Sequence, residues 1–188
     1  MRLFLAIKIP ANIRNEITER IVEIKRLGPK VRWIAGDNLH ITIVFLGEIN
    51  REKAQQLEKI CNRVIPELSV FEIGLGKLGL FSHKNKPKII WLGINEGKEN
   101  LQKLYKKLTI YLQEKKFNLE SRSYIPHLTL GKIKTEKNKE VEDLVETTNL
   151  EKKWCFRVEE IKIMSSELSS SGAVYKEISN FRLQNLSS

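Results

Sequence analysis

Apolar and polar residues alternate in two short stretches of the chain that carry the same polar pair. In residues 39–46 the polar members are His40 and Thr42, and in residues 126–130 they are His127 and Thr129. Successive side chains of a strand point to opposite faces. Each stretch therefore predicts a strand with an imidazole and a hydroxyl on one face and an apolar backing on the other. The repetition predicts one site shared by both strands.

The rest of the pattern predicts helices mixed with strands. Apolar residues at helical spacing predict helices over 11–27, 51–65 (capped by Asn50), 98–115 and, more weakly, the highly charged 136–146. Strands are predicted over 1–10, 31–35, 69–74, 77–81, 88–94, 158–165 and 173–178, with a basic loop at 82–87 and a Ser-rich turn at 169–172. This order indicates α+β or α/β, with strands too short and too often hairpin-linked for a purely doubly wound sheet.

No linker divides the sequence, so a single domain over residues 1–188 is expected. The first His strand and its following helix resemble the second His strand and the helix after it. This similarity indicates an internal duplication, in which two strand-helix halves face each other.

Charge and cysteine content narrow the class of protein. The chain has 33 Lys and Arg against 23 Asp and Glu, a net charge of +10. Such an excess favours a polyanionic partner such as nucleic acid, although a solvated Lys-rich surface explains the charge equally simply. Cys61 and Cys155 show no ligand spacing and are expected to be reduced thiols of a cytoplasmic protein. No apolar run approaches the roughly 20 residues of a membrane span, so no membrane association is expected.

Two of the three histidines occur in the His-x-Thr frame, and this pairing points to acid-base chemistry. Imidazoles titrate near neutral pH, so one can accept a proton while the other gives one. A hydroxyl two residues along the strand can donate a hydrogen bond to an anionic oxygen such as that of phosphate. No carboxylate cluster accompanies the histidines, and two ligands are too few for a typical zinc site. Metal-free phosphodiester hydrolysis without a cofactor is therefore the predicted chemistry.

The segments around these histidines, 40–47 and 126–130, resemble the paired motifs of the 2H phosphoesterases, and more closely the RNA 2′,3′-cyclic phosphodiesterases long called 2′-5′ RNA ligases. Segments 2–7, 31–33, 91–93 and 165–175 extend the likeness over nearly the whole chain. The resemblance implies a bilobal, pseudo-twofold α+β fold, with two antiparallel-rich sheets, helices outside, and a central cleft to which each lobe contributes one His-x-Thr strand. It also implies opening of RNA 2′,3′-cyclic phosphate ends, on tRNA fragments or nucleotides, by a monomer without metal.

The resemblance also suggests roles for individual residues. It favours His127 as the general base on water and His40 as the general acid toward the 3′ oxygen, although the residues alone leave the reverse assignment open. Thr42 and Thr129 would hold the non-bridging phosphate oxygens.

Four further residues are candidates for substrate binding. Lys132 stands where the family commonly has Arg. Lysine keeps the positive charge but lacks the planar fork of the guanidinium. Arg122 matches a family Arg, with a structural salt bridge as the alternative. Phe45 is expected near the nucleobase by resemblance, yet strict alternation sends it to the core unless a bulge or strand end intervenes. Tyr175 is a candidate for the cleft or for the core, and His83 is expected in the basic loop, where it contacts RNA phosphates or solvent.

Three other functions stay open on the sequence. Ligation of RNA halves through a 2′-5′ bond is the reverse reaction at the same residues. A non-catalytic RNA-binding module would use the basic surface, and a metal-dependent phosphatase would lose activity with EDTA.

Overall fold

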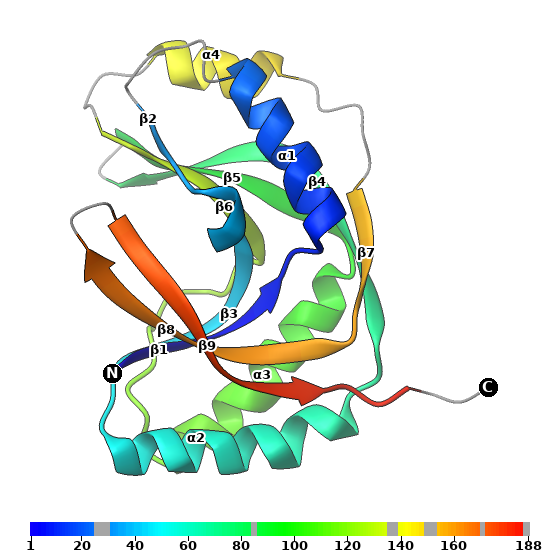
Figure 1. Cartoon of the computed structure of the whole chain (residues 1–188), viewed down its shortest axis with the longest axis vertical. Coiled ribbons are helices and arrows are strands. Elements are labelled where there is room, and N and C mark those ends of the chain that lie inside the picture. Colours follow the sequence, from blue (N-terminus) through cyan, green and yellow to red (C-terminus); the bar gives the residue numbers. More distant parts are fainter. Residues whose placement is uncertain (25–30, 84–85, 135–138, 149–153, 170–171, 186–188) are drawn as a thin grey trace.

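The computed structural model describes residues 1–24, 31–83, 86–134, 139–148, 154–169 and 172–185. In this part of the chain nine strands form one sheet and four α-helices cover it (Figure 1). The helices are α1 (Ala11–Ile24), α2 (Arg51–Val64), α3 (Lys98–Glu114) and α4 (Lys139–Thr147). The strands are β1 (Arg2–Lys8), β2 (Val31–Trp33), β3 (His40–Glu48), β4 (Phe71–His83), β5 (Lys86–Glu96), β6 (His127–Ile133), β7 (Trp154–Val158), β8 (Glu160–Ser169) and β9 (Gly172–Arg182).

The sheet is antiparallel throughout its named strands and has the order β7-β4-β5-β6-β3-β1-β8-β9, with β2 also paired to β6. Its centre is its weakest point, because β3 and β6 are joined by the single pair Ile41 and Leu128. The expectation of two separate sheets is therefore wrong in detail. Two multi-stranded halves exist, but the two His strands join them into one curled sheet.

The helices bury one face of this sheet. In the half containing β3, α3 packs on β3 and α2 packs on α3 and β9, whereas α4 packs on β4 in the other half. In Figure 1, α2 and α3 lie in the lower half of the view, and α1 and α4 lie in the upper half. The buried core runs continuously between the halves through the apolar backing of the His strands, including Ile41, Ile43, Leu128 and Leu130. The opposite face of the His strands is left for polar residues.

Most predicted elements are present with shifted ends. Asn50 caps α2 as expected, because its side-chain oxygen accepts a hydrogen bond of 2.9 Å from the backbone of Lys53. The helix predicted over 136–146 is α4, beginning among the described residues at Lys139. The strand predicted over 31–35 is shorter, because a 3-10 turn, η2 (Gly36–Asn38), follows β2.

Two predictions about strands were wrong. The strands expected over 69–74 and 77–81 are the single strand β4, which continues through irregular pairing near Leu75 instead of turning. As a result the basic loop is shorter than predicted: β4 runs to His83, β5 starts at Lys86, and the tip between them lies outside the described residues. The strand β7 was not predicted at all, although its residues alternate between buried and exposed.

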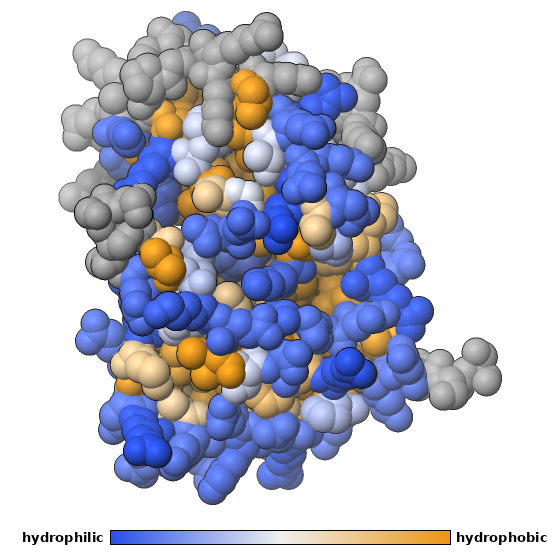
Figure 2. All heavy atoms as spheres, viewed as in Figure 1, coloured by the Kyte–Doolittle hydropathy of each residue, from blue (hydrophilic) through white to orange (hydrophobic). Residues whose placement is uncertain are grey.

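The outer surface matches the basic, polar composition. The face in Figure 2 is mainly hydrophilic, and apolar side chains gather only in small separate patches. Among the described helices none is both long and apolar enough to cross a membrane.

Candidate active site

The two His-x-Thr pairs lie side by side on the open face of the sheet. Ile41 and Leu128, which pair β3 with β6, are both fully buried on the core face. The histidines and threonines on either side of them are half-buried and point the other way. One step from an antiparallel pair, the neighbours are Thr42 with His127 and His40 with Thr129. The fold thus brings together four polar side chains from positions 87 residues apart in the chain.

Both imidazoles are held in the same tautomer by backbone carbonyls. Nδ1 of His40 lies 2.7 Å from the carbonyl oxygen of Asn38, and Nδ1 of His127 lies 2.7 Å from that of Ile125. A carbonyl only accepts, so each Nδ1 carries the proton and each neutral ring keeps a lone pair on Nε2. The same contact two residues upstream leaves Nε2 of each ring as the atom that exchanges protons with a ligand.

Aromatic side chains surround His40. Its ring centroid lies 5.0 Å from that of Phe4 and 5.0 Å from that of Tyr175, whose ring is edge-on. Burial lowers the pKa of His40, the hydrogen bond to Asn38 raises it in part, and the charge of His127 lowers it further. A positive charge on His127 therefore disfavours protonation of His40.

His127 has a similar environment built from the other half of the sheet. Its ring centroid lies 4.8 Å from that of Phe81 and 6.2 Å from that of Trp91. Burial again lowers the pKa, against a smaller opposing effect of the hydrogen bond to Ile125. Trp91 fits there because Gly79 has no side chain: a Cβ at Gly79 would lie 2.4 Å from the indole ring. Each histidine is therefore neutral more readily than a free imidazole and sits against two aromatic rings.

In each His strand, the residue three positions after the histidine is left unpaired. In the β1–β3 pairing, Ala6 pairs with Thr42 and Leu5 with Val44, so Ile43 is skipped. In the β5–β6 pairing, Trp91 pairs with Thr129 and Ile90 with Gly131, so Leu130 is skipped. Such a bulge reverses the alternation of the side chains that follow.

The bulges decide where Phe45 and Lys132 lie. Each stands five residues after a histidine, and strict alternation would place both on the core face. Instead, Phe45 packs against the small cluster of Phe4, Ala6, Met164 and Tyr175 beside His40. Lys132 is exposed and pairs with Ile89, while its neighbours Gly131 and Ile133 are buried. The open face therefore gains an aromatic ring from one half and an ammonium group from the other.

The structure places the remaining candidate residues in different surroundings. Tyr175 joins the site through its contact with His40, so it lies beside that ring and not in the main core. Arg122 is exposed in the segment before β6 and makes no ion pair with any described residue, so the alternative of a structural salt bridge finds no support there. The structure gives it no contact with either histidine. The side chain of His83 lies outside the described residues, and its backbone ends β4.

This arrangement suits an anion between two neutral imidazoles and two hydroxyls. The lone pair of one Nε2 can take a proton from water, and the other ring, once protonated, can give a proton to an oxygen that leaves. In the described part of the chain, no group of three or more His, Cys, Asp or Glu side chains is arranged to hold a metal ion. The geometry supports general acid-base chemistry at a phosphate.

Comparison with protein families identifies the origin of the paired motifs. The family model described as the 2′-5′ RNA ligase superfamily matches residues 10–169, which include both His strands. The chain belongs to this superfamily.

Curated members of the superfamily cover nearly the full chain. An RNA 2′,3′-cyclic phosphodiesterase of Methanocaldococcus jannaschii is 34% identical over 179 residues, covering 95% of this chain and 98% of that protein. One of Thermotoga maritima is 32% identical over 179 residues, covering 94% of this chain and 92% of that protein. Among solved structures, apo LigT of Escherichia coli has a TM-score of 0.77 at 26% identity, covering 98% of each chain. The same protein complexed with 3′-AMP has a TM-score of 0.77 at 25% identity over 97% of each chain.

Several residues around the His-x-Thr pairs were not predicted from the sequence. The guanidinium carbon of Arg2 lies 5.1 Å from the centroid of the Phe45 ring, and the hydroxyl of Tyr124 donates a 3.2 Å hydrogen bond to the carbonyl of Thr42. Phe4 and Phe81 contact the histidines directly. Residues 3–7 of β1 are all apolar and all buried, so no alternation in the sequence set Phe4 apart from its neighbours in the core.

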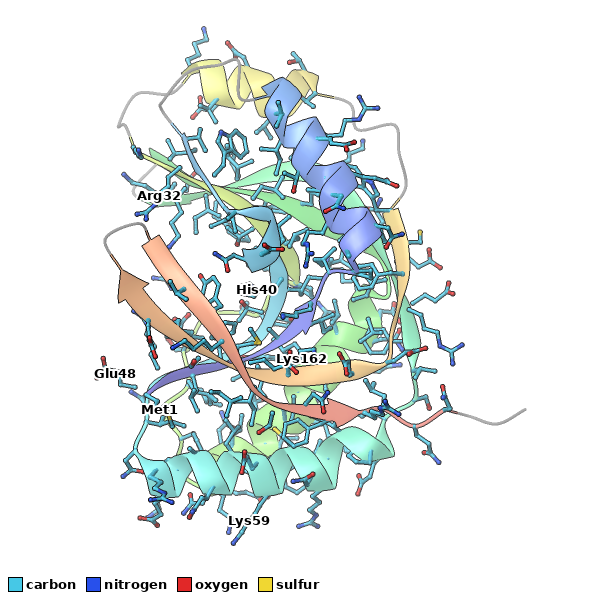
Figure 3. All side chains as sticks on the ribbon, viewed as in Figure 1. Met1, Arg32, His40, Glu48, Lys59 and Lys162 are labelled. Carbon is cyan, nitrogen blue, oxygen red and sulfur yellow. The ribbon has the colours of Figure 1, made fainter. Side chains whose placement is uncertain are left out.

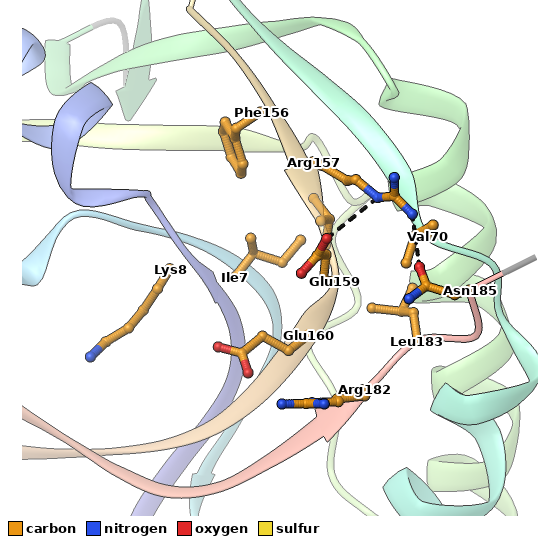
Figure 4. A pocket seen from close by; sticks show the side chains of 11 residues that line it. Ile7, Lys8, Val70, Phe156, Arg157, Glu159, Glu160, Arg182, Leu183 and Asn185 are labelled. Atoms are coloured by element: carbon orange, nitrogen blue, oxygen red, sulfur yellow. Dashed lines mark hydrogen bonds and ion pairs between the residues drawn. The ribbon is translucent and has the colours of Figure 1, made fainter.

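A separate cavity of about 340 Å³ lies apart from the His-x-Thr pairs (Figure 4). It lies where β7 turns into β8 beside the end of β9, and neither histidine lines it. Two of the charged side chains around it pair with each other: Arg157 lies 3.5 Å from Glu159, and Arg157 also donates a 2.7 Å hydrogen bond to Asn185. In Figure 3, His40 is labelled nearer the centre of the view than Arg32, the middle residue of β2, which is labelled at the left.

Proposed function

We propose that the protein is an RNA 2′,3′-cyclic phosphodiesterase, an enzyme that opens the cyclic phosphate at the 3′ end of RNA to a 2′-phosphate. The observation that carries this proposal is the pair of imidazoles on two neighbouring strands, each with Nδ1 fixed on a carbonyl and Nε2 left for a ligand. The names of the Methanocaldococcus jannaschii and Thermotoga maritima relatives supply the substrate. A solved relative complexed with 3′-AMP supports a nucleotide-sized ligand.

In the proposed reaction, Nε2 of His127 accepts a proton from water while the water oxygen bonds to phosphorus. The bond between phosphorus and the 3′ oxygen breaks, and protonated His40 gives its proton to that oxygen. The product carries a 2′-phosphate and a free 3′ hydroxyl. Thr42 and Thr129 donate hydrogen bonds to the two non-bridging oxygens, because each hydroxyl stands beside the opposite histidine. Exchange with solvent then restores the original protonation of both rings.

The division of acid and base roles has its own test. A substrate with sulfur in place of the bridging 3′ oxygen needs little help from an acid, because a thiol has a pKa near about 8.5. With this substrate the His40→Ala enzyme should approach the wild-type rate, and the His127→Ala enzyme should remain slow. The opposite pattern would assign the acid role to His127.

The test of the activity is incubation of a short RNA ending in a 2′,3′-cyclic phosphate with the purified protein, followed by identification of the product. Formation of a 2′-phosphate in the presence of EDTA is expected, because the proposed chemistry uses no metal or other cofactor. Release of a 3′-phosphate would refute the assigned leaving oxygen. Loss of turnover with EDTA, restored by a divalent metal, would favour a metal-dependent phosphatase.

A second candidate is 2′-5′ ligation, which the description of the superfamily favours. It opens the same cyclic phosphate in the same direction, with the 5′ hydroxyl of a second RNA in place of water: the 5′ oxygen bonds to phosphorus, the bond to the 3′ oxygen breaks, and a 2′-5′ diester results. Joining of RNA halves through a 2′-5′ bond at a rate comparable with hydrolysis would support it. Salt-sensitive RNA binding with no change of the cyclic phosphate would instead indicate a non-catalytic RNA-binding module.

We further propose that the protein acts in the cytoplasm, as a monomer, with residues 1–188 forming one bilobal unit. Its RNA substrates would include tRNA fragments or nucleotides with cyclic ends, and Arg122 would contact them outside the cleft. Light scattering checks the monomer, since a mass near twice 21.9 kDa would contradict it.

A further inference from the structure

The edge of the cleft beyond Thr129 carries two cations on adjacent strands. Arg32 of β2 and Lys132 of β6 are directly paired in the antiparallel ladder, and both are exposed. Residues directly opposite each other on neighbouring strands have side chains on the same face. Arg32 has no assigned role, and Lys132 is so far only a candidate for binding the substrate.

The neighbours of Arg32 determine which face it occupies. Val31 and Trp33 pack against the main hydrophobic core, so the side chain between them points to the opposite face. On β6 the core side chains near this pair are Leu130 and Ile133. Arg32 and Lys132 therefore share the open face with the His-x-Thr pairs.

The position of β2 explains why this face is reachable. β3 pairs with β6 only at Leu128, and further along the same edge of β6 the partner is β2, which pairs with residues 131–133. Where the two halves of the sheet separate, β2 replaces β3 as the strand paired with this edge of β6. Lys132 lies three residues beyond Thr129, about 7–10 Å along the strand. That is the scale of one nucleotide step, and Arg32 lies about 5 Å to the side.

The ammonium group of Lys132 has no counter-ion among the described residues. Like charges directly opposite each other on neighbouring strands destabilise a sheet, because they repel. Lys132 makes no ion pair with any residue in the described ranges. A bound anion would supply a counter-charge at Lys132. A guanidinium also binds phosphate through two parallel hydrogen bonds, which an ammonium cannot do.

We propose that Arg32, together with Lys132, binds the phosphate that precedes the reacting nucleotide, and so makes the enzyme prefer RNA chains to cyclic mononucleotides. This inference rests on the proposed function and names the substrate class of the same site. A nucleoside 2′,3′-cyclic phosphate has no preceding phosphate, so it cannot use this contact. An oligonucleotide with a cyclic end presents that phosphate one step from the site.

The test compares kcat/KM for a trinucleotide ending in a cyclic phosphate with that for the matching nucleoside cyclic phosphate. Arg32→Gln should lower the first value about tenfold and leave the second unchanged, because only the first substrate has the phosphate it binds. On the trinucleotide, the kcat/KM of Arg32→Lys should fall between those of wild type and Arg32→Gln, since lysine keeps the charge and loses the fork. The matched control is Arg63→Gln, which alters an arginine stacked on Tyr111 on the outer helices and should change neither value.

A change in the substrate gives the same information without relying on the variant. Replacing the preceding phosphate by a neutral methylphosphonate should cost the wild-type enzyme about the same factor, and should cost Arg32→Gln nothing more. Equal loss on both substrates, or no loss on either, would overturn the proposal. So would independent, multiplicative effects of the variant and the methylphosphonate.

Failure of the proposed function would look different. If the wild-type protein opened neither cyclic phosphate, the activity would be refuted. The Arg32 contact would then be decided by equilibrium binding of a 3′-phosphorylated trinucleotide and its methylphosphonate analogue. Tighter binding of the first by wild type, with the difference lost in Arg32→Gln, would still support the contact, and equal binding would exclude it.

Discussion

Replacement of Thr42 by valine isolates the contribution of one hydroxyl group to the proposed reaction. Valine has nearly the same shape as threonine but cannot donate a hydrogen bond. Thr42 stands beside His127 in the pairing of β3 with β6, on the half-buried open face. Its hydroxyl is therefore available to a non-bridging phosphate oxygen between the two histidines.

The size of the effect follows from the charge of the acceptor. A hydrogen bond to a charged group contributes about 1.5–3 kcal/mol, and 1.4 kcal/mol corresponds to about a factor of ten in rate. Thr42→Val should thus lower kcat/KM on a cyclic-phosphate RNA by about tenfold to a hundredfold. The same change at Thr129 should have a similar effect, because the two hydroxyls occupy matching positions beside opposite histidines.

The assay is steady-state hydrolysis of a fluorescently labelled oligonucleotide with a cyclic end. Thr42→Ser is the matched control, since it keeps the hydroxyl and should retain most of the activity. Thermal unfolding of Thr42→Val should stay close to that of wild type, because the side chain is not part of the main core. A valine variant with wild-type kcat/KM, or a serine variant as slow as the valine variant, would refute the role of the hydroxyl.

Four further measurements test other parts of the account. Burial lowers the pKa of both His40 and His127, so kcat/KM should fall from pH 6.5 to pH 8 as the singly protonated pair disappears from the free enzyme; a flat profile would contradict this. The same shifts mean that the unfolded chain binds more protons just below about pH 6.5, so stability should decrease as pH falls through that range. Asn50→Ala should lower the free energy of unfolding by about 0.5–2 kcal/mol through loss of the α2 cap, whereas Asn62→Ala on the same helix should have little effect. Hydrolysis should proceed at the same rate after treatment with EDTA, and a metal-restored loss would count against metal-free chemistry.

The polar face of each His strand was predictable because the opposite face consists of apolar residues that pack in the core. Ile41 and Leu128 have no alternative to burial, and a strand alternates strictly over such a short span, so His40 and His127 were correctly expected on the open face. The helices were predictable for a similar reason, since their apolar stripes and the Asn50 cap are local features. The catalytic roles of these residues remain predictions.

The placement of Phe45 and Lys132 could not be derived from alternation alone. Each depends on a bulge three residues after a histidine, and a bulge is set by pairing with a neighbouring strand. The apolar residues at the bulges, Ile43 and Leu130, look no different from ordinary strand residues. The bulge anticipated for Phe45 is present, but its counterpart before Lys132 was not foreseen.

The number of sheets and the strand β7 also depend on distant contacts. A single residue pair joins the two halves, and the local sequence of neither strand predicts such a pair. β7 is five residues long, and its alternation gains meaning only from its pairing with residues 71–75 of β4. Phe4 and Phe81 are similar cases, because their distance from the histidines in sequence hides their contact with the rings.

The claim on which the proposal depends is that His40 and His127 act on one phosphorus atom. The most direct measurement is the turnover of a cyclic-phosphate RNA by His40→Ala, by His127→Ala and by the double variant. Each single change should reduce kcat by about 10²–10⁴-fold, and the double change should cost far less than the product of the two, because acid and base act in the same step. Near-wild-type turnover in either single variant, or fully multiplicative losses in the double variant, would contradict a shared phosphate.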